Sequence, residues 1–308
     1  MKYSELAAAF ADLKKVPPTF AVSPEREKIL LRLDKIFGEP DSEISPTLGR
    51  FYRECIDSAL SEIKSYNSTT PRLWKFYSSG ILIKSARRTL AIDINDGCVP
   101  VQGRTAITLH SSQLRSLADI IDEYYCTHSH SDHISPKLCD ALARRGKRIV
   151  MPAESIRRWM IRGAVPAEKF CSEHCQVFMN WQECGSEKLD CAMYFFSLSN
   201  NRTAMVRGDI YHEKGFDACL SHLHQWGKPV DYAFLTPYFT GGVNPVEALA
   251  RNFSYRFIPI HEWEFSHRGF GKKGAATQCY SELYEDFRFW YRHGYAQVLS
   301  WGESIFLT

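Results

Sequence analysis

The sequence predicts an α/β protein in which two β-sheets pack together and helices lie on their outer faces. Three observations lead to this prediction. Short runs of strand-forming residues alternate with helical segments from residue 73 onwards, two pairs of these runs are joined by polar turns, and the preceding residues show helical spacing only. A chain of 308 residues can bury a full hydrophobic core as one large domain or two ordinary ones.

The first part of the chain, residues 1–72, is expected to be a helical N-terminal extension. Ser23 and Pro24 are typical of an N-cap and a first helical turn, and apolar residues recur at helical spacing over 29–36. A second helix is expected to start at Pro46 and to run to about Ile63. The apolar stripes of these helices need burial, so we expect the extension to pack on the sheets as a cap or to form a dimer contact.

The elements expected after residue 73 are short and alternate in type. Gly80–Lys84 and Thr89–Ile94 form one hairpin, and Ala192–Leu198 and Thr203–Arg207 form a second, because each pair of apolar runs flanks a polar turn. The other expected elements, in order, are a helix at 111–118, a strand at 123–127, a helix at 135–145, a strand at 148–151, a helix at 217–226, a strand at 232–236, a helix at 246–253, a strand at 257–260, a helix at 278–291, and a last strand pair around Gln297 and Ile305.

The composition disfavours several classes of protein. The formal net charge is only +3, and outside the basic run at 144–148 the chain has no basic stripe, so nucleic acid is not the expected partner. The N-terminal segment lacks the apolar core of a signal peptide, and no stretch approaches about 20 apolar residues, so we expect no membrane span and a cytoplasmic location. A small-molecule substrate is the expected partner, and a homo-oligomer is compatible with the sequence.

The stretch THSHSDHIS at residues 127–135 is concentrated in metal-binding side chains. Three of the eleven histidines and one aspartate, namely His128, His130, Asp132 and His133, fall within six positions directly after a predicted strand. In an extended loop the first two histidines point the same way, and a tight turn after them directs Asp132 and His133 towards a neighbouring point. Imidazole and carboxylate groups suit zinc, manganese or iron, and one loop of this kind could supply ligands to two ions. The alternative is a polar loop whose side chains only cap the adjacent elements.

The pattern His128-x-His130-x-Asp132-His133 resembles the HxHxDH motif of the metallo-β-lactamase-fold hydrolases. The stretch FYSSGILIKSARRTLAIDI is similar to the opening hairpin of that fold, and Asp93 matches the aspartate at its end. The resemblance implies a four-layer αββα sandwich over residues 73–308. The hairpin and the histidine-rich loop are similar to those of the branch that includes ascorbate-6-phosphate lactonase-like proteins. It also implies a metal-dependent hydrolase that uses a metal-activated water on an ester, lactone or phosphodiester-type bond.

The same resemblance implies ligands farther along the chain. The family has a bridging aspartate in a Gly-Asp pair after a strand, which Gly208-Asp209 matches, and the glycine lets the backbone come close to the metals. The family also has a histidine at the end of a later strand, which His261 matches, with His267 as a competitor. Without the motif, Asp209 could be a helix cap and His261 a core histidine.

Two metal sites follow from this assignment. The second would be complete, with Asp132, His133, Asp209 and His261, whereas the first would hold only His128, His130 and the shared Asp209. Asp132 could also act in catalysis by orienting the water or by moving a proton. The expected cofactor is a divalent metal, with zinc first and manganese or iron as alternatives, and one or two ions per chain.

One expected ligand is missing from the first site. The family places a third histidine on a loop before the second hairpin, and the corresponding stretch here, NWQECGSEKLD, contains none. By chemical type Glu183 or Cys184 could replace it and Gln182 only weakly, and we take Glu183 as the candidate substitute. The gap also leaves open an alternative function, a catalytically impaired binding or regulatory protein of the same fold with an incomplete first metal site.

Overall fold

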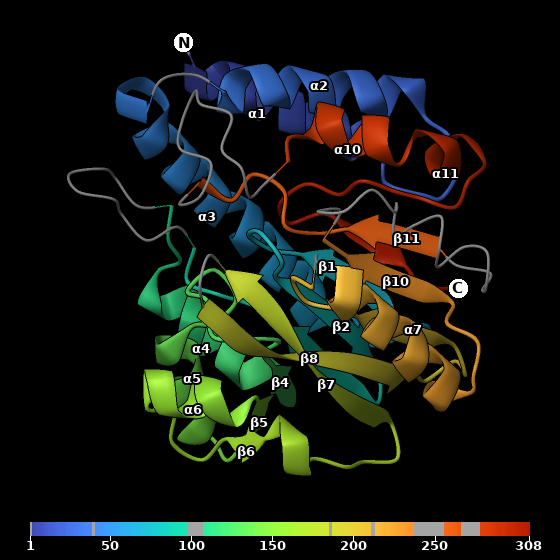
Figure 1. Ribbon diagram of the computed structural model, residues 1–308. Coiled ribbons are helices and arrows are strands. Elements are labelled where there is room, and N and C mark those ends of the chain that lie inside the picture. Colours follow the sequence, from blue (N-terminus) through green and yellow to red (C-terminus); the bar gives the residue numbers. More distant parts are fainter. Residues whose placement is uncertain are drawn as a thin grey trace.

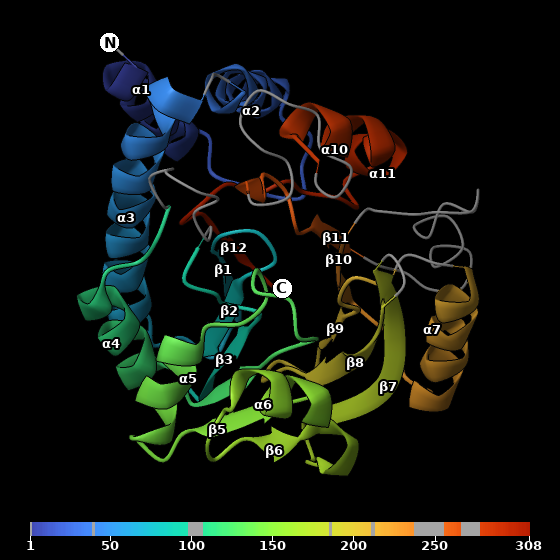
Figure 2. The ribbon, with the colours of Figure 1, turned by 60° about the vertical axis from the view of Figure 1, so that its left-hand side comes forward.

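Two β-sheets lie at the centre of the protein, and helices cover their outer faces (Figures 1 and 2). The structure is a computed structural model that describes residues 2–38, 41–97, 107–184, 187–210, 213–236, 256–265 and 278–308. The first sheet consists of β1 (Arg72–Lys75), β2 (Ile81–Ser85), β3 (Arg88–Ile92), β4 (Glu123–Tyr125), β5 (Arg148–Met151), β6 (Val165–Pro166) and β12 (Ser304–Phe306), in the spatial order β12-β1-β2-β3-β4-β5-β6. The second sheet consists of β7 (Cys175–Cys184), β8 (Glu187–Ser197), β9 (Thr203–Val206), β10 (Tyr232–Leu235) and β11 (Arg256–Pro259), in the order β11-β10-β9-β8-β7.

The helices follow the chain around these sheets. They are α1 (Lys2–Lys15), α2 (Pro24–Phe37), α3 (Asp41–Ser65), α4 (Ser111–Ile120), α5 (Pro136–Ala143), α6 (Ala153–Trp159), the 3₁₀ turn η1 (Ala167–Lys169), α7 (Glu213–Trp226), α10 (Tyr280–Asp286) and α11 (Arg288–Arg292). In Figure 2, α7 lies outside the second sheet, and α3, α4 and α5 lie outside the first.

Strand β8 shows why the sheets form a sandwich. Successive side chains of a strand point to opposite faces of the sheet. Tyr194 and Phe196 accordingly point inwards and contact Tyr125 of the other sheet, at ring-centroid distances of 5.1 and 4.9 Å. Phe195 points outwards and lies 5.3 Å from Trp226 of α7. Both faces of β8 are therefore buried, one between the sheets and one beneath a helix.

The N-terminal helices share an apolar core with the helical outer layer of the first sheet and with the C-terminal segment. Phe37 at the end of α2 stacks on Trp301, with 4.9 Å between ring centroids. Asp34 in the same helix accepts hydrogen bonds from Trp263 Nε1 and Tyr280 N, both at 2.8 Å. In Figure 1, α2 runs beside α10 across the top of the molecule. Helix α2 thus contacts segments that lie more than 200 residues away in the sequence.

The strand directions place several loops at one edge of the sandwich. Strands β3, β4 and β5 are parallel neighbours in the first sheet, and β9, β10 and β11 are parallel neighbours in the second. Parallel neighbours end at the same edge, and loops at the carboxyl ends of such strands are where α/β proteins bind ligands. The segments that follow β3, β4, β9, β10 and β11 include residues 93, 127–133, 209, 236 and 261.

The structure corrects two helix predictions. Helix α3 begins at Asp41 rather than at Pro46, so the proline lies inside it. A proline there is tolerated because it removes only one backbone hydrogen bond near the start of the helix. The helix expected at 278–291 is two helices, because the backbone turns at Phe287 (φ −100°, ψ 13°) although Tyr291 N–H still donates to its carbonyl at 2.8 Å.

The predictions just before the second hairpin and near the C-terminus also need correction. The stretch NWQECGSEKLD was interpreted as a loop, but its two sides belong to β7 and β8, which pair over the whole length of β7. Gln297 and Ile305 do not form a strand pair. Ser304–Phe306 pairs with β1, whereas Gln297 N–H donates to Phe257 O at 3.0 Å beside β11. The second error arose because Ser304–Phe306 pairs with a strand more than 200 residues away in the sequence.

Two expected features, the helix at 246–253 and His267, lie outside the described residues. Of the helices that the structure does describe, none combines the length and apolar character needed to cross a lipid bilayer.

Candidate metal centre

The loop 127–133 occupies a short connection between β4 and α5. Ser135 ends this connection as the N-cap of α5, since its Oγ accepts the Leu138 N–H at 3.0 Å and Pro136 takes the first helical position. Within the loop, His133 N–H donates to His130 O at 3.1 Å and closes a turn. The loop therefore starts from a buried strand and ends at a capped helix, which limits the positions of its side chains.

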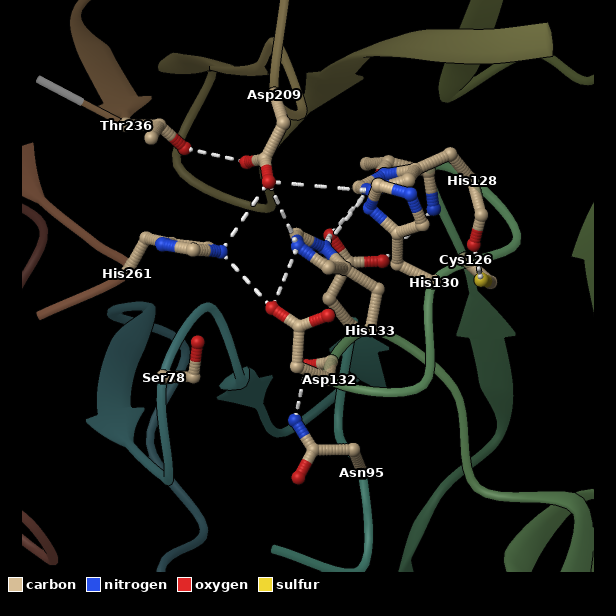
Figure 3. A network of polar contacts seen from close by, with 12 residues as sticks. Ser78, Asn95, Cys126, His128, His130, Asp132, His133, Asp209, Thr236 and His261 are labelled. Atoms are coloured by element: carbon tan, nitrogen blue, oxygen red, sulfur yellow. Dashed lines mark hydrogen bonds and ion pairs between the residues drawn. The ribbon is translucent and has the colours of Figure 1, made fainter. Parts of the chain in front are cut away.

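Four side chains from three distant segments converge at one point beside this loop (Figure 3). His261 Nε2 lies 2.9 Å from Asp132 Oδ2 and 3.2 Å from Asp209 Oδ2. His133 Nε2 lies 3.1 Å from Asp209 Oδ2 and 3.4 Å from Asp132 Oδ2. All four side chains are buried, and their ligand atoms lie within 4.8 Å of one another.

A smaller group, which corresponds to the first site of the sequence-based assignment, lies next to the four-residue group and shares Asp209 with it. It contains His128, His130 and Asp209, whose ligand atoms again lie within 4.8 Å of one another. His128 Nε2 is 3.0 Å from His130 Nδ1 and 3.9 Å from Asp209 Oδ2. Burial, together with the neighbouring His133, lowers the pKa of His128 well below its ordinary value, so this imidazole is neutral, as a metal ligand must be.

These separations fit a shared metal ion. Ligand atoms at about 2.1 Å from one zinc-type ion lie roughly 3.0–3.4 Å apart in tetrahedral or octahedral geometry. The four contacts within the four-residue group span 2.9–3.4 Å. The donors are also of the type that zinc, manganese and iron accept. In the described part of the chain, no set of three or more His, Cys, Asp or Glu side chains outside these two groups meets the same distance criterion.

The charges of the four-residue group balance one another. Burial lowers the pKa of His261, but the carboxylates of Asp209 and Asp132 outweigh it and raise the pKa to about 10. The same opposition raises the pKa of His133 well above its usual range. Burial raises the pKa of Asp209, but the imidazoles of His261 and His133 outweigh this effect and bring the pKa well below its ordinary value. An imidazole must lose its proton to bind an ion, so metal binding here would release protons and would be favoured as the pH rises.

Two residues outside the ligand set hold Asp209 in place. Thr236 Oγ1, at the end of β10, donates to Asp209 Oδ1 at 2.8 Å and leaves Oδ2 directed at the histidines. Gly208 has φ +68°, and a Cβ there would lie 2.7 Å from Cys191 Sγ and 2.9 Å from the Cβ of Thr127. The glycine is thus required by a close approach to neighbouring protein atoms and by its left-handed backbone.

His261 also sits on an unusual backbone. Its φ is +76°, and its N–H donates to Ser78 O at 3.2 Å. The next residue, Glu262, forms a fully buried ion pair with Lys75, with 3.0 Å between Nζ and Oε1. A left-handed non-glycine residue persists only where its surroundings fix it, so this ion pair and backbone bond direct the imidazole towards Asp132.

Asp93 connects the hairpin to the histidine loop. Its Oδ1 accepts Thr127 N–H at 2.7 Å, and its Oδ2 accepts Thr127 Oγ1 at 2.7 Å. Oδ2 also lies 2.9 Å from His133 Nδ1, so this ring nitrogen donates to the carboxylate and Nε2 is turned towards Asp209. A carboxylate behind a ligand histidine sets its orientation and its tautomer.

We expect Asp93→Asn to weaken metal binding by about 10–100-fold, because an amide has only one acceptor oxygen and cannot accept both from Thr127 N–H and from His133 Nδ1–H. The measurement is competition for zinc with a chromophoric chelator. Asp122→Asn is the matched control. Asp122 accepts Thr89 N–H at 2.9 Å near the start of β3, whereas Asp93 follows the end of that strand. Equal zinc affinity in the two variants would contradict the positioning role.

The substitute ligand predicted for the first site, Glu183, lies in β7 and pairs with Lys188 of β8. Its side chain lies outside the described residues, so its role as a ligand stays a prediction. The preceding residue, Gln182, is buried, and its Nε2 lies 3.2 Å from His130 Nδ1. Sequence reasoning ranked Gln182 low because an amide is a weak ligand, and it missed Thr236 and Asn95, which donates to the backbone carbonyl of Asp132.

A cleft of about 420 Å³ opens beside the metal groups. It is lined by Ser129, His130, Ser131, Asp132, Arg158 and Trp159. Trp159 is fixed by donation of its Nε1–H to Ser129 O at 2.8 Å. A small molecule in this cleft could therefore reach one side chain of each metal group.

The architecture agrees with the fold that the HxHxDH motif implies: the protein has the αββα fold of the metallo-β-lactamase superfamily. Among solved structures, it is similar to a possible metal-dependent hydrolase from Veillonella parvula DSM 2008 (11% identity, TM-score 0.54, covering 77% of this chain and 98% of the other). It is also similar to isothiocyanate hydrolase from Delia radicum gut bacteria (14%, 0.54, 76% and 98%) and to the β-hydroxylase CmlA (12%, 0.51, 77% and 54%). No protein-family model matches the sequence, and comparison with curated proteins gives no match. At identities this low, the structural similarity establishes the fold alone, and the chemistry rests on the chain's own residues.

Proposed function

We propose that the protein is a metal-dependent hydrolase that cleaves an ester, lactone or phosphodiester-type bond in a small molecule. The observation that supports this most directly is the convergence of two histidine and aspartate groups around the shared Asp209, at separations that suit bound ions. The proposed ligands are His128, His130, Asp132, His133, Asp209 and His261. Zinc is the first expectation, with manganese or iron as alternatives and one or two ions per chain.

A bound divalent ion supplies two functions in such a site, since it lowers the pKa of a water molecule and polarises the oxygen of the bond to be cleaved. The chain's residues supply the rest. Asp132 lies at the boundary between the ligand group and the cleft, so its carboxylate can orient a water molecule and accept a proton. His133 and His261 are held by Asp93 and by the Lys75–Glu262 turn, so the group is arranged before a substrate enters.

The rim of the cleft offers a means of orienting a small substrate. Arg158 lines the cleft, and its guanidinium, which forms an ion pair with Glu187 at 3.1 Å, supplies a positive charge there. The Trp159 side chain beside it supplies an apolar surface. A substrate with an anionic group and an apolar part would match both, with its reactive bond next to Asp132.

The alternative is a binding or regulatory protein that keeps the fold without turnover. One observation favours it. The group of His128, His130 and Asp209 contains only three of the ligands expected for the first site, and a glutamine lies beside His130 where a stronger ligand would be expected. We also propose that the activity belongs to a domain of residues 73–308, that residues 1–72 are its helical extension, and that the protein acts in the cytoplasm.

The proposal is tested by stripping the protein with a chelator, reloading it with zinc, manganese or iron, and measuring metal content together with turnover of lactone, thioester and phosphodiester substrates. We expect reloading to restore turnover of at least one substrate, and His133→Ala to lose both metal and turnover. His224→Ala, which changes an exposed histidine on α7, is the control and should retain both. A fully loaded protein that turns over none of these substrates would favour the binding protein instead.

A further inference from the structure

Gln182 stands out among the buried polar side chains near the cleft. It lies near the end of β7, opposite Leu189 of β8, and is only 2% exposed. Its Nε2 lies 3.2 Å from His130 Nδ1, whereas its Oε1 is buried and has no hydrogen-bond partner among the described residues. Asn180, two residues earlier on the same strand, differs, because its Nδ2 donates to Gly215 O at 3.0 Å and its Oδ1 accepts Trp181 N–H at 2.9 Å.

An acceptor that is buried without a partner is rare in native proteins and indicates an absent ion or water or a functional role. We propose that Gln182 is the fourth protein ligand of the group formed by His128, His130 and Asp209, and that its Oε1 binds the ion there. The inference rests on the proposed metal centre, and it goes beyond that proposal by assigning the ligand that the sequence lacked.

The geometry of the group supports this assignment. Gln182 Nε2, His130 Nδ1 and His128 Nε2 form a chain of contacts at 3.2 and 3.0 Å, which are separations found between the paired atoms of the neighbouring group. Half a turn of the carboxamide about its last bond exchanges its nitrogen and oxygen. Oε1 would then lie where Nε2 now lies, 3.2 Å from His130 Nδ1 and next to its lone pair, and both atoms could face one ion. The amide nitrogen would take the buried position that no hydrogen-bond donor among the described residues now reaches.

A consequence follows from the chemistry of the amide. A carboxamide oxygen carries no net charge and binds zinc-type ions less strongly than an imidazole or a carboxylate. The neighbouring group, by contrast, has two histidines and two aspartates. We therefore expect two ions to bind in two separate steps, with the weaker step at the group that contains Gln182.

The test is a titration of the chelator-stripped protein with Co²⁺, followed by its absorption spectrum and by native mass spectrometry. Gln182→Glu keeps the size of the side chain and adds a charged ligand, and Gln182→Leu removes the ligand. We expect Gln182→Glu to tighten the weaker step, and Gln182→Leu to weaken it, by about tenfold or more in each case, with the stronger step unchanged. Asp132→Ala should remove the stronger step, because Asp132 belongs only to the other group, and this variant assigns each step to its group.

If both Gln182 variants bind two ions with the affinities of the unaltered protein, Gln182 is only a hydrogen-bond partner of His130 and the inference is wrong. Loss of the stronger step in Gln182→Leu would also overturn it, since that result means a general structural defect. A protein that binds no Co²⁺ at all would overturn the metal centre and this inference together, so the two failures can be told apart.

Discussion

Replacement of Asp209 by alanine is expected to remove metal from both groups and to reduce turnover to the level of the chelated protein. Asp209 Oδ2 lies 3.1 Å from His133 Nε2, 3.2 Å from His261 Nε2 and 3.9 Å from His128 Nε2, so this one oxygen faces ligands of both proposed ions. We expect metal affinity to fall by at least about 100-fold, more than for a residue behind the ligands.

The measurement is metal content by mass spectrometry after dialysis, combined with turnover of whichever substrate the panel identifies. Asp217→Ala is the matched control, because Asp217 is an exposed aspartate on α7. Circular dichroism separates loss of the ligand from loss of the fold. An Asp209→Ala protein that keeps its full metal content would show that the two groups do not share this residue.

Arg26→Ala is expected to cause a large loss of stability. The Arg26 side chain is fully buried and donates to Val16 O at 3.1 Å, to Val298 O at 2.9 Å and to both carboxylate oxygens of Glu303. Burial lowers the pKa of Arg26, but the Glu303 carboxylate outweighs this effect and raises it, so the guanidinium stays charged. Removing one partner of a buried pair costs about 3–5 kcal/mol, because the other charge remains without compensation.

For a chain of this size such a loss corresponds to a Tm lower by on the order of 10 °C. Thermal and urea unfolding measure it. Arg32→Ala, one turn and a half further along α2, is the control, because its ion pair with Asp12 is exposed and such pairs contribute at most about 1 kcal/mol. If both variants lose the same small amount, the N-terminal helices are not anchored to the C-terminal segment in the way the structure shows.

Helix starts and the histidine loop could be predicted from the sequence because their determinants are local. Ser23 caps α2 by accepting Arg26 N–H, and Ser135 caps α5, as the Ser-Pro pairs indicated. The strands β2 and β3 lie within the predicted hairpin for the same reason, since two apolar runs and a polar turn are close in the chain. The four motif residues between 128 and 133 needed only one short loop to come together.

The contact between Gln182 and His130 could not be predicted from the sequence, because it depends on which face of β7 meets the histidine loop. That strand was interpreted as a loop, and its approach to His130 joins segments about 50 residues apart. Thr236 was missed for the same reason, since its contact with Asp209 depends on β9 and β10 ending at one edge.

By itself, then, the amino-acid sequence determined which segments can be helices and strands and which loop carries ligand-type side chains, because these properties depend on neighbours a few positions apart. The tertiary structure decided which side chains meet, how His133 is oriented by Asp93, and that the amide of Gln182 lies beside His130. Such contacts depend on strand register and on loops from both sheets meeting at one edge, and no short-range pattern in the chain encodes these features.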